Sequence, residues 1–206
     1  GIVMTIYFGD GSSMAAAAGG NSTKLADANG TLTSGNDGDD YEIVVTGLGG
    51  YHQINFSLFV GHAQSNSNTG GNANATIQIG KSDGLITERY RWAENDQATS
   101  DVQQEKDYMY FTAAEGNHLG HHTGTNAKCS LVAMKMFNWN NTTDIVYGYG
   151  QHIRTSSTSQ WCRHRNVAFH NPLTNHAMDR ISFRFPNIAV GNNGTRYHYV
   201  IEGISS

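Results

Sequence analysis

Apolar and polar residues alternate along many short runs of this 206-residue chain. Such period-2 alternation is typical of a β-strand with one buried face. The clearest run puts six alternate positions on one face: His52, Ile54, Phe56, Leu58, Val60 and His62. Further runs cover residues 41–45, 75–79, 85–92, 107–112, 128–139, 144–154, 161–169, 179–185 and 196–202. Because the runs recur every 10 to 20 residues or so, without a 3.6-residue period, we predict an all-β protein, an antiparallel β-sandwich of jelly-roll type.

The last two runs are expected to pair with each other. Between them, Asn192-Asn193-Gly194 supplies residues that tolerate a positive φ, so the chain can reverse there. We therefore predict a closing hairpin whose core side chains are Ile181, Phe183, Phe185, Tyr197, Tyr199 and Ile201.

The run at residues 128–139 carries apolar side chains on both faces. One face has Val132, Met134 and Met136, and the other has Cys129, Leu131, Ala133 and Phe137. A strand with two apolar faces needs a second layer, which either a loop of the sandwich or another subunit can provide.

Residues 1–39 differ from the rest in composition. After a short apolar run at residues 4–8, this segment consists mainly of Gly, Ser, Thr, Asn, Asp and Ala, which bury too little apolar surface to fold alone. We predict an extended N-terminal arm over 1–39, which orders against its own domain or a neighbouring subunit, and a β-sandwich domain over 40–206. Ser12 or Ser13 is a candidate cap for one helical turn over residues 14–18. Ile6, Tyr7 and Phe8 are candidates for docking the arm.

Charge and hydropathy exclude two classes of partner. The formal net charge is −4, from 13 basic and 17 acidic residues, and no block of Lys and Arg is present, so we expect no nucleic-acid partner. No apolar run approaches the roughly 18 residues of a membrane-spanning helix, so we expect no membrane insertion.

Histidines invite a metal hypothesis. His118, His121 and His122 lie close together in a Gly-rich segment, where a further ligand from His62, His152, His164 or His170 would complete a site. In a three-fold assembly a single loop histidine near the axis would become three ligands. The alternative is a set of exposed loop histidines and no cofactor.

The sequence gives little support to catalysis. A GxSxG motif is absent, and the carboxylates between residues 88 and 115 lie mostly in a polar stretch that we interpret as a solvated loop or a surface helical turn. We therefore expect a non-enzymatic protein with no catalytic residues. Some of eight aromatic residues are candidates for a surface that binds sugar rings, and core or subunit contacts are the alternative: Tyr90, Trp92, Tyr108, Tyr110, Trp139, Tyr147, Tyr149 and Trp161. From these we select Tyr90, Trp92, Trp139 and Trp161.

Both ends of the chain resemble a known group. The segments are IYFGDGSS at residues 6–13, DDYEIVVTGL at 39–48, DRISF at 179–183, Gly191-Asn192, Gly194-Thr195 and IEGI at 201–204. They are similar to small virion structural proteins of marine and cyanobacterial phages, of the tail-fibre, appendage or decoration type, with an IYFGDG-like N-terminus. In that group the last strand usually ends in a Leu-Tyr-Gly-Ile-like sequence. The resemblance covers both ends of the chain and almost none of residues 63–170.

This resemblance implies a non-enzymatic virion protein with a β-sandwich body, assembled in the bacterial host cytoplasm. We expect a tail-fibre or appendage protein for host attachment, with a capsid decoration (cement) protein and a carbohydrate-binding module as alternatives. Expected partners are other virion proteins and host surface polysaccharide, and the expected oligomer is a homotrimer.

Overall fold

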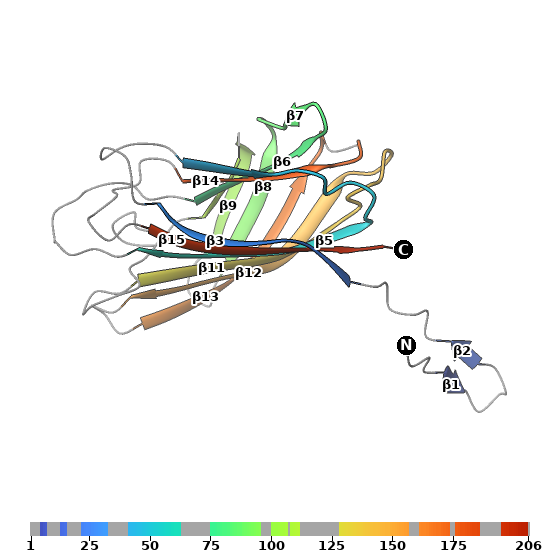
Figure 1. Ribbon diagram of the computed structural model, residues 1–206, viewed down its shortest axis with the longest axis horizontal. Helices are drawn as coiled ribbons and strands as arrows, with labels where there is room; N and C mark the ends of the chain where they lie inside the picture. Colours follow the sequence, from blue (N-terminus) through green and yellow to red (C-terminus); the bar gives the residue numbers. More distant parts are fainter. Residues whose placement is uncertain are drawn as a thin grey trace.

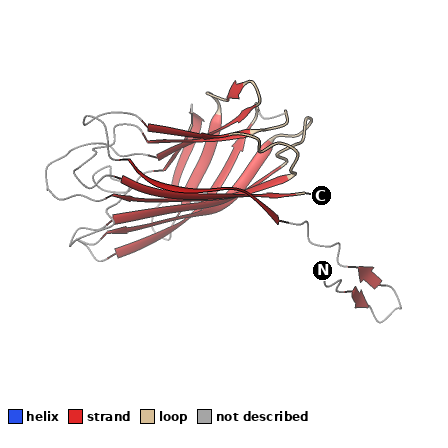
Figure 2. Ribbon diagram, viewed as in Figure 1, coloured by secondary structure: helices blue, strands red, loops and turns tan. Residues whose placement is uncertain are grey.

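The structure, a computed structural model, describes residues 5–7, 13–15, 22–32, 41–62, 75–95, 100–106, 108–111, 128–156, 161–173, 176–185 and 195–205. These residues form strands and turns, and none of them is helical (Figure 2). The described part of the chain accordingly holds no helix of the length and apolarity needed to cross a membrane. The all-β prediction is confirmed.

Within these ranges the chain forms fifteen strands. They are β1 (Thr5–Tyr7), β2 (Ser13–Ala15), β3 (Ser22–Leu32), β4 (Tyr41–Val45), β5 (Gln53–His62), β6 (Ala75–Lys81), β7 (Gly84–Leu85), β8 (Tyr90–Asn95), β9 (Ser100–Lys106), β10 (Met109–Phe111), β11 (Lys128–Phe137), β12 (Val146–Ser156), β13 (Trp161–Asn171), β14 (Arg180–Phe185) and β15 (Thr195–Ile204).

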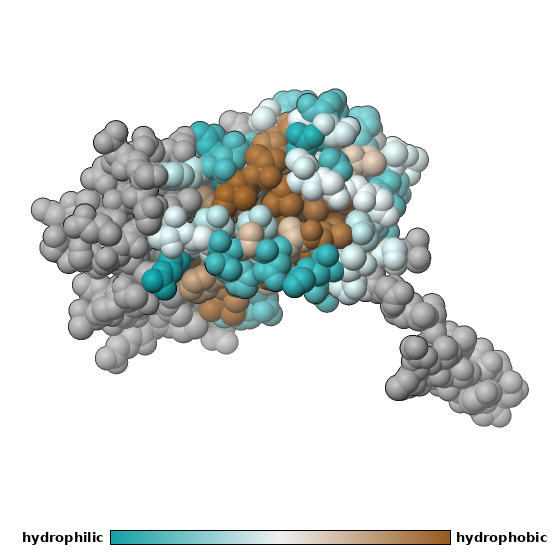
Figure 3. Space-filling view, viewed as in Figure 1, coloured by the Kyte–Doolittle hydropathy of each residue, from teal (hydrophilic) through white to brown (hydrophobic). Residues whose placement is uncertain are grey.

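Two antiparallel sheets face each other (Figure 1). The small sheet has the order β10-β6-β14-β4, with β7 paired to β6, and the large sheet has the order β3-β15-β5-β11-β12-β13-β8-β9. Between the two layers lies a band of apolar side chains, visible in Figure 3. The predicted antiparallel β-sandwich is confirmed.

The core forms where the inward positions of both sheets meet. On β5, Ile54, Phe56, Leu58 and Val60 are buried, as the alternation predicted. From the opposite sheet, Phe183 on β14 packs its ring 5.7 Å from that of Phe56, centroid to centroid. Buried aromatic pairs of this kind add to the stabilisation from burial itself.

The predicted closing hairpin is wrong. Strand β14 pairs with β4 and β6 in the small sheet, whereas β15 pairs with β3 and β5 in the large sheet. The two strands meet across the core, where the rings of Phe183 and Tyr199 lie 5.5 Å apart. Alternation specifies which face of a strand is buried, but it does not specify which strand is its partner. The nine residues 186–194 are long enough to connect two sheets that pack roughly 10 Å apart.

Part of the predicted arm belongs to the large sheet. Strand β3 pairs with β15 from Ser22 opposite Ile204 to Leu32 opposite Thr195, with one irregularity at Ile201/Glu202. Residues 22–32 therefore order against their own domain, which was one of the two alternatives, and the sandwich includes residues before 40. Polar residues suit β3 because it is an edge strand of the sheet.

Two other local predictions are corrected. Residues 13–15 form strand β2, paired with β1, and not the start of a helical turn. The Gly9-Asp10-Gly11 sequence between the two strands favours reversal of the chain over helix initiation. The polar stretch near residue 100 contains β9, which pairs with β8 at the other edge of the large sheet. An edge strand needs less apolar surface than an inner one, so its polar sequence resembles that of a loop.

Candidate functional site

The outer face of the large sheet carries the side chains that alternate with the core. On β11, Val132, Met134 and Met136 point inward and are at most 2 % exposed. Leu131, Ala133 and Phe137 are half-buried on the outer side, and Lys135 is exposed there. The facing sheet is the second layer on the inner side of β11, whereas a cover of its outer face by a loop or another subunit stays a prediction.

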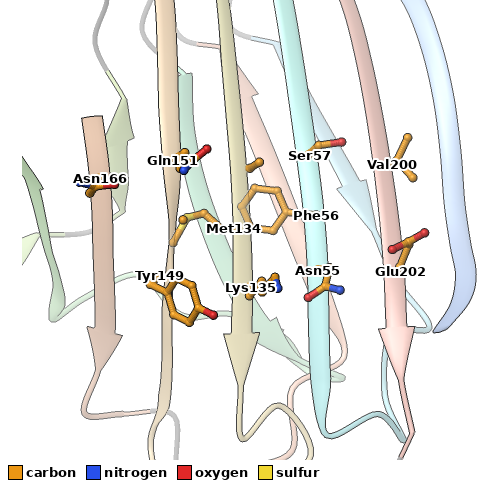
Figure 4. A pocket seen from close by; sticks show the side chains of 12 residues that line it. Asn55, Phe56, Ser57, Met134, Lys135, Tyr149, Gln151, Asn166, Val200 and Glu202 are labelled. Atoms are coloured by element: carbon orange, nitrogen blue, oxygen red, sulfur yellow. The ribbon is translucent and has the colours of Figure 1, made fainter. Parts of the chain in front are cut away.

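Strand register arranges the outer side chains in rows across the sheet. In the first row Glu202, Asn55, Lys135 and Tyr149 are successive partners on β15, β5, β11 and β12. In the second row Val200, Ser57, Ala133, Gln151 and Asn166 are successive partners from β15 to β13. Figure 4 shows these strands side by side with the labelled side chains. Since neighbouring strands lie about 4.8 Å apart, each row runs at right angles to the strands at that spacing.

These two rows line an open depression of about 740 Å³, which we call the outer groove. Its floor is the sheet itself, because parts of the inward-facing residues between the rows also contribute to the lining. The lining residues are Asn55, Phe56, Ser57, Ala133, Met134, Lys135, Tyr149, Gly150, Gln151, Asn166, Val200 and Glu202. The groove thus combines amide, hydroxyl, ammonium and carboxylate groups with one exposed aromatic ring.

Three aromatic rings stack at the side of the groove. Phe137 lies opposite Tyr147, with ring centroids 5.4 Å apart, and its ring also lies 5.7 Å from that of Tyr149. Both pairs are inclined by only 20°. Tyr147 and Tyr149 are two residues apart on β12, so they share a face, and they are 47 % and 55 % exposed. This aromatic cluster gives the outer face an apolar surface with hydroxyl groups.

Charged side chains gather at the β3 end of the same face. Asp27 on β3 accepts a hydrogen bond from Lys24 Nζ at 3.0 Å, and its other oxygen lies 2.9 Å from His198 Nε2. The contact with His198, followed by that with Lys24, lowers the pKa of Asp27 below its usual value. Lys24 is the register partner of Glu202, so basic groups border the carboxylate end of the groove.

Chemically, the outer groove is equipped for binding. Among the described residues that line it, Glu202 is the single carboxylate, whereas glycoside hydrolysis by general acid–base chemistry requires a pair of carboxylates across the scissile bond. Amide and hydroxyl groups, by contrast, offer both donors and acceptors for a polar ligand.

Three of the four aromatic residues proposed for surface binding lie in the core instead. Tyr90 and Trp139 are 0 % exposed and Trp92 is 6 % exposed, so none presents a ring to a ligand. The indole nitrogen of Trp139 donates to Leu48 O at 2.9 Å, which satisfies its only polar atom. Large rings gain more from burial than from exposure, and these three lie at inward positions. Trp161 is in β13, but its side chain is outside the described residues.

The remaining proposed site residues are not brought together in the described structure. His118, His121 and His122 lie outside the described residues, as does Phe8, while Ile6 and Tyr7 are in β1 without described side chains. Within the described ranges, no three His, Cys, Asp or Glu side chains are grouped as metal ligands. The metal site stays a prediction.

Tyr147 and Tyr149 were among the eight aromatic candidates but not among the four selected from the sequence, although a signal for the cluster exists. In residues 146–150, Val-Tyr-Gly-Tyr-Gly, the inward positions beyond Val146 are glycines and the outward positions are tyrosines. When a strand carries its aromatic rings on the face that points away from the core, those rings are either exposed to solvent or covered by another molecule. The sequence alone did not show which face of this strand was inward.

Comparisons with known proteins assign the chain to no family. No protein-family model matches the chain, and no curated protein matches it. Among solved structures, the chain is similar to the crystal structure of Lectin I from Ulex europaeus in complex with the methyl glycoside of alpha-L-fucose. The match covers 89 % of this chain and 98 % of the lectin chain, with 6 % sequence identity and a TM-score of 0.28.

Proposed function

We propose that this protein is a non-enzymatic attachment protein of a bacteriophage virion, a tail-fibre or appendage component that binds host surface polysaccharide through its outer groove. The observation that carries the binding role is Tyr149, whose exposed ring belongs to the aromatic cluster and also lines the groove. The virion role is supported by the resemblance of the two ends of the sequence to small phage structural proteins.

The composition of the groove suits sugars. A pyranose ring has an apolar face that packs against flat aromatic rings, and hydroxyl groups around its rim that need donors and acceptors. Tyr149 supplies the ring, and Asn55, Gln151 and Asn166 supply amides within the two rows. Since amides both donate and accept, they match hydroxyl groups, which do the same.

The shape of the groove favours a polymer over a small molecule. Sites for small ligands are usually concave pockets that bury most of the ligand, whereas this groove is open and crosses five strands of the sheet. An extended chain that crosses the strands meets a new side chain at each strand spacing. Affinity can then come from repeated weak contacts along the chain.

Binding of the full-length protein to a panel of bacterial and algal polysaccharides tests this proposal. We expect Tyr149→Ala and Tyr147→Ala to weaken binding about tenfold, which corresponds to about 1.4 kcal/mol, because each removes a stacking surface. Val44→Ala is the matched control, since Val44 is 45 % exposed on the small sheet, away from the groove.

Two results would contradict the proposal. If no polysaccharide binds, the binding role fails. If the isolated protein releases reducing sugar from a bound polymer, the non-enzymatic assignment fails.

A further inference from the structure

We propose that the outer groove recognises an acidic sugar, with the carboxylate of a uronic acid residue at Lys135 and the pyranose ring against Tyr149. This inference rests on the proposed function and names the chemical class of its ligand.

Lys135 occupies the middle of the first row. Its neighbours there are Asn55 on β5 and Tyr149 on β12, and its side chain is exposed on the outer face. Among the described residues it takes part in no ion pair, although Asp27, Asp83 and their basic partners do. The groove therefore holds an ammonium group whose counter-charge must come from solvent or from a ligand.

Asn55 adds a second donor beside Lys135. The oxygen of its side chain, Oδ1, accepts a hydrogen bond from Gln53 Nε2 at 2.6 Å. With Oδ1 engaged, the Nδ2 group of Asn55 remains to donate to a ligand. Lys135 and Asn55 thus present donors at adjacent positions of one row, an arrangement complementary to the two acceptor oxygens of a carboxylate.

Tyr149 fixes where the sugar ring can lie. It is the direct register partner of Lys135, so the Cβ atoms of the two residues are about 5 Å apart. A carboxylate attached directly to a pyranose ring lies within that span when the ring packs on the tyrosine. The ring and charge of one uronic acid residue therefore fit two neighbouring side chains.

Glu202 determines the polarity of the groove. It lies beyond Asn55, two strands from Lys135, so the charges in the row are arranged as carboxylate, amide and ammonium. At the Glu202 end the neighbouring ammonium of Lys24 is paired with Asp27, so a ligand carboxylate would meet mixed charges there, whereas at Lys135 it would meet an ammonium that takes part in no ion pair among the described residues. Each uronic acid residue that binds is thereby directed toward the Lys135 end.

The test uses full-length protein with polygalacturonate, alginate and hyaluronate, each compared with its methyl ester. Esterification keeps the sugar backbone and removes the charge. We expect at least one acid polymer to bind about tenfold more tightly than its ester at low salt, and the difference to shrink as salt screens the charge.

Substitutions then assign the effect to Lys135. Lys135→Met should abolish the preference for the acid over its ester, and Lys135→Arg should retain the preference, since it keeps the charge. Glu202→Gln should keep or increase the preference. A thermal unfolding curve for each variant checks that the fold is intact.

The outcomes separate this inference from the proposed function. If neutral polymers or esters bind as tightly as the acids, or Lys135→Met keeps the preference, the acidic-sugar inference is wrong while polysaccharide binding stands. If no acid or neutral polymer binds at all, the proposed function itself fails.

Discussion

The hydroxyl group of Tyr90 links separate backbone segments in the core. Its Oη accepts a hydrogen bond from Ile79 N at 2.8 Å and can donate to Ile86 O at 2.8 Å or to Ile79 O at 3.1 Å. The side chain is fully buried, and this burial raises the pKa of the phenol well above its usual value of 10.0. One residue thereby joins β8 to β6 and to the segment after β7.

Tyr90→Phe should therefore destabilise the protein by about 1–3 kcal/mol, because a buried N–H and a buried carbonyl lose their partner. The pH dependence should change too. Above pH 10 the unfolded chain releases the phenol proton while the folded chain keeps it, so the stability from Tyr90 is complete below pH 10 and lost as the pH rises. Urea unfolding between pH 8 and pH 11 measures both effects, and an unchanged alkaline slope in the variant would contradict the second.

Two glycines near the β6–β7 connection make a matched pair. A Cβ on Gly80 would lie 2.7 Å from Leu85 Cα and still closer to Gly84 O, which are backbone atoms that cannot turn away, whereas a Cβ on Gly84 would meet nothing within 4 Å. Gly80→Ala should cost about 1–3 kcal/mol from overpacking, and Gly84→Ala should change the free energy of unfolding by less than about 0.5 kcal/mol. Equal effects of the two substitutions in a thermal melt would disprove the steric argument.

At the residue scale, the sequence predicts burial better than it predicts the surface. The alternation around Phe56 and around Phe183 identified buried side chains correctly, because hydrophobic burial follows the period of the strand. The burial of aromatic residues was harder to predict. Tyr90 and Trp139 are buried and Tyr149 is 55 % exposed, although all three carry large aromatic rings. Only the packing of the two sheets determines which rings are covered.

At the scale of the elements, β3 shows that a polar strand can still be part of a sheet. It pairs with β15 along ten register positions, and Leu25 and Ala26 pack partly against the core. The composition of this segment predicted an arm that could not fold alone, which agrees with an edge strand that needs a partner. The composition did not show which strand would pair with this segment, because any sequence can form backbone hydrogen bonds with a neighbouring strand.

Truncation distinguishes the two parts of the predicted arm. Removal of residues 1–21 should leave the free energy of unfolding almost unchanged, because β1 and β2 pair with each other as a separate two-stranded sheet. Removal of residues 1–39 also deletes β3, and we expect a loss of several kcal/mol, since ten cross-strand positions at about 0.2–1 kcal/mol each are lost. Chemical denaturation of the two truncated proteins measures the difference.

The result for the longer truncation bears directly on the sequence-based boundary. If removal of residues 1–39 leaves stability as high as removal of residues 1–21, then β3 does not contribute to the sandwich and a domain that starts at residue 40 is sufficient.

For strand pairing, the sequence carried less information than for strand identity. The sequence analysis recognised the runs that form β14 and β15 but predicted that they pair in one sheet. In the structure β14 lies in the small sheet and β15 lies in the large sheet. A turn sequence such as Asn-Asn-Gly allows reversal without requiring that the flanking strands pair. Their separation into two sheets places Phe183 and Tyr199 on opposite sides of the core, where their tilted rings lie 5.5 Å apart.

At the scale of the whole molecule, the sandwich places the outer groove on the far side of the large sheet from the core. The side chains that line the groove are mostly not those that hold the sheets together, since the two sets alternate along β5, β11 and β12. Binding can therefore change through outer positions such as Lys135 and Tyr149 without loss of the fold. The sequence predicted the sandwich, but the groove depends on register across five strands, and register is not visible in any single run.

This separation predicts that docking and attachment can be removed independently. In phage particles, a protein lacking residues 1–21 should fold and bind polysaccharide but fail to incorporate, because the proposed docking residues Ile6, Tyr7 and Phe8 are gone. A Tyr149→Ala protein should incorporate normally, while the particles adsorb to host cells about tenfold more slowly.

Quantitative blotting of purified particles measures incorporation, and adsorption kinetics with Val44→Ala particles as control measure attachment. If the truncated protein incorporates at the normal level, the docking role of the N-terminal segment is wrong; if Tyr149→Ala particles adsorb like the control, polysaccharide binding by the groove does not serve attachment.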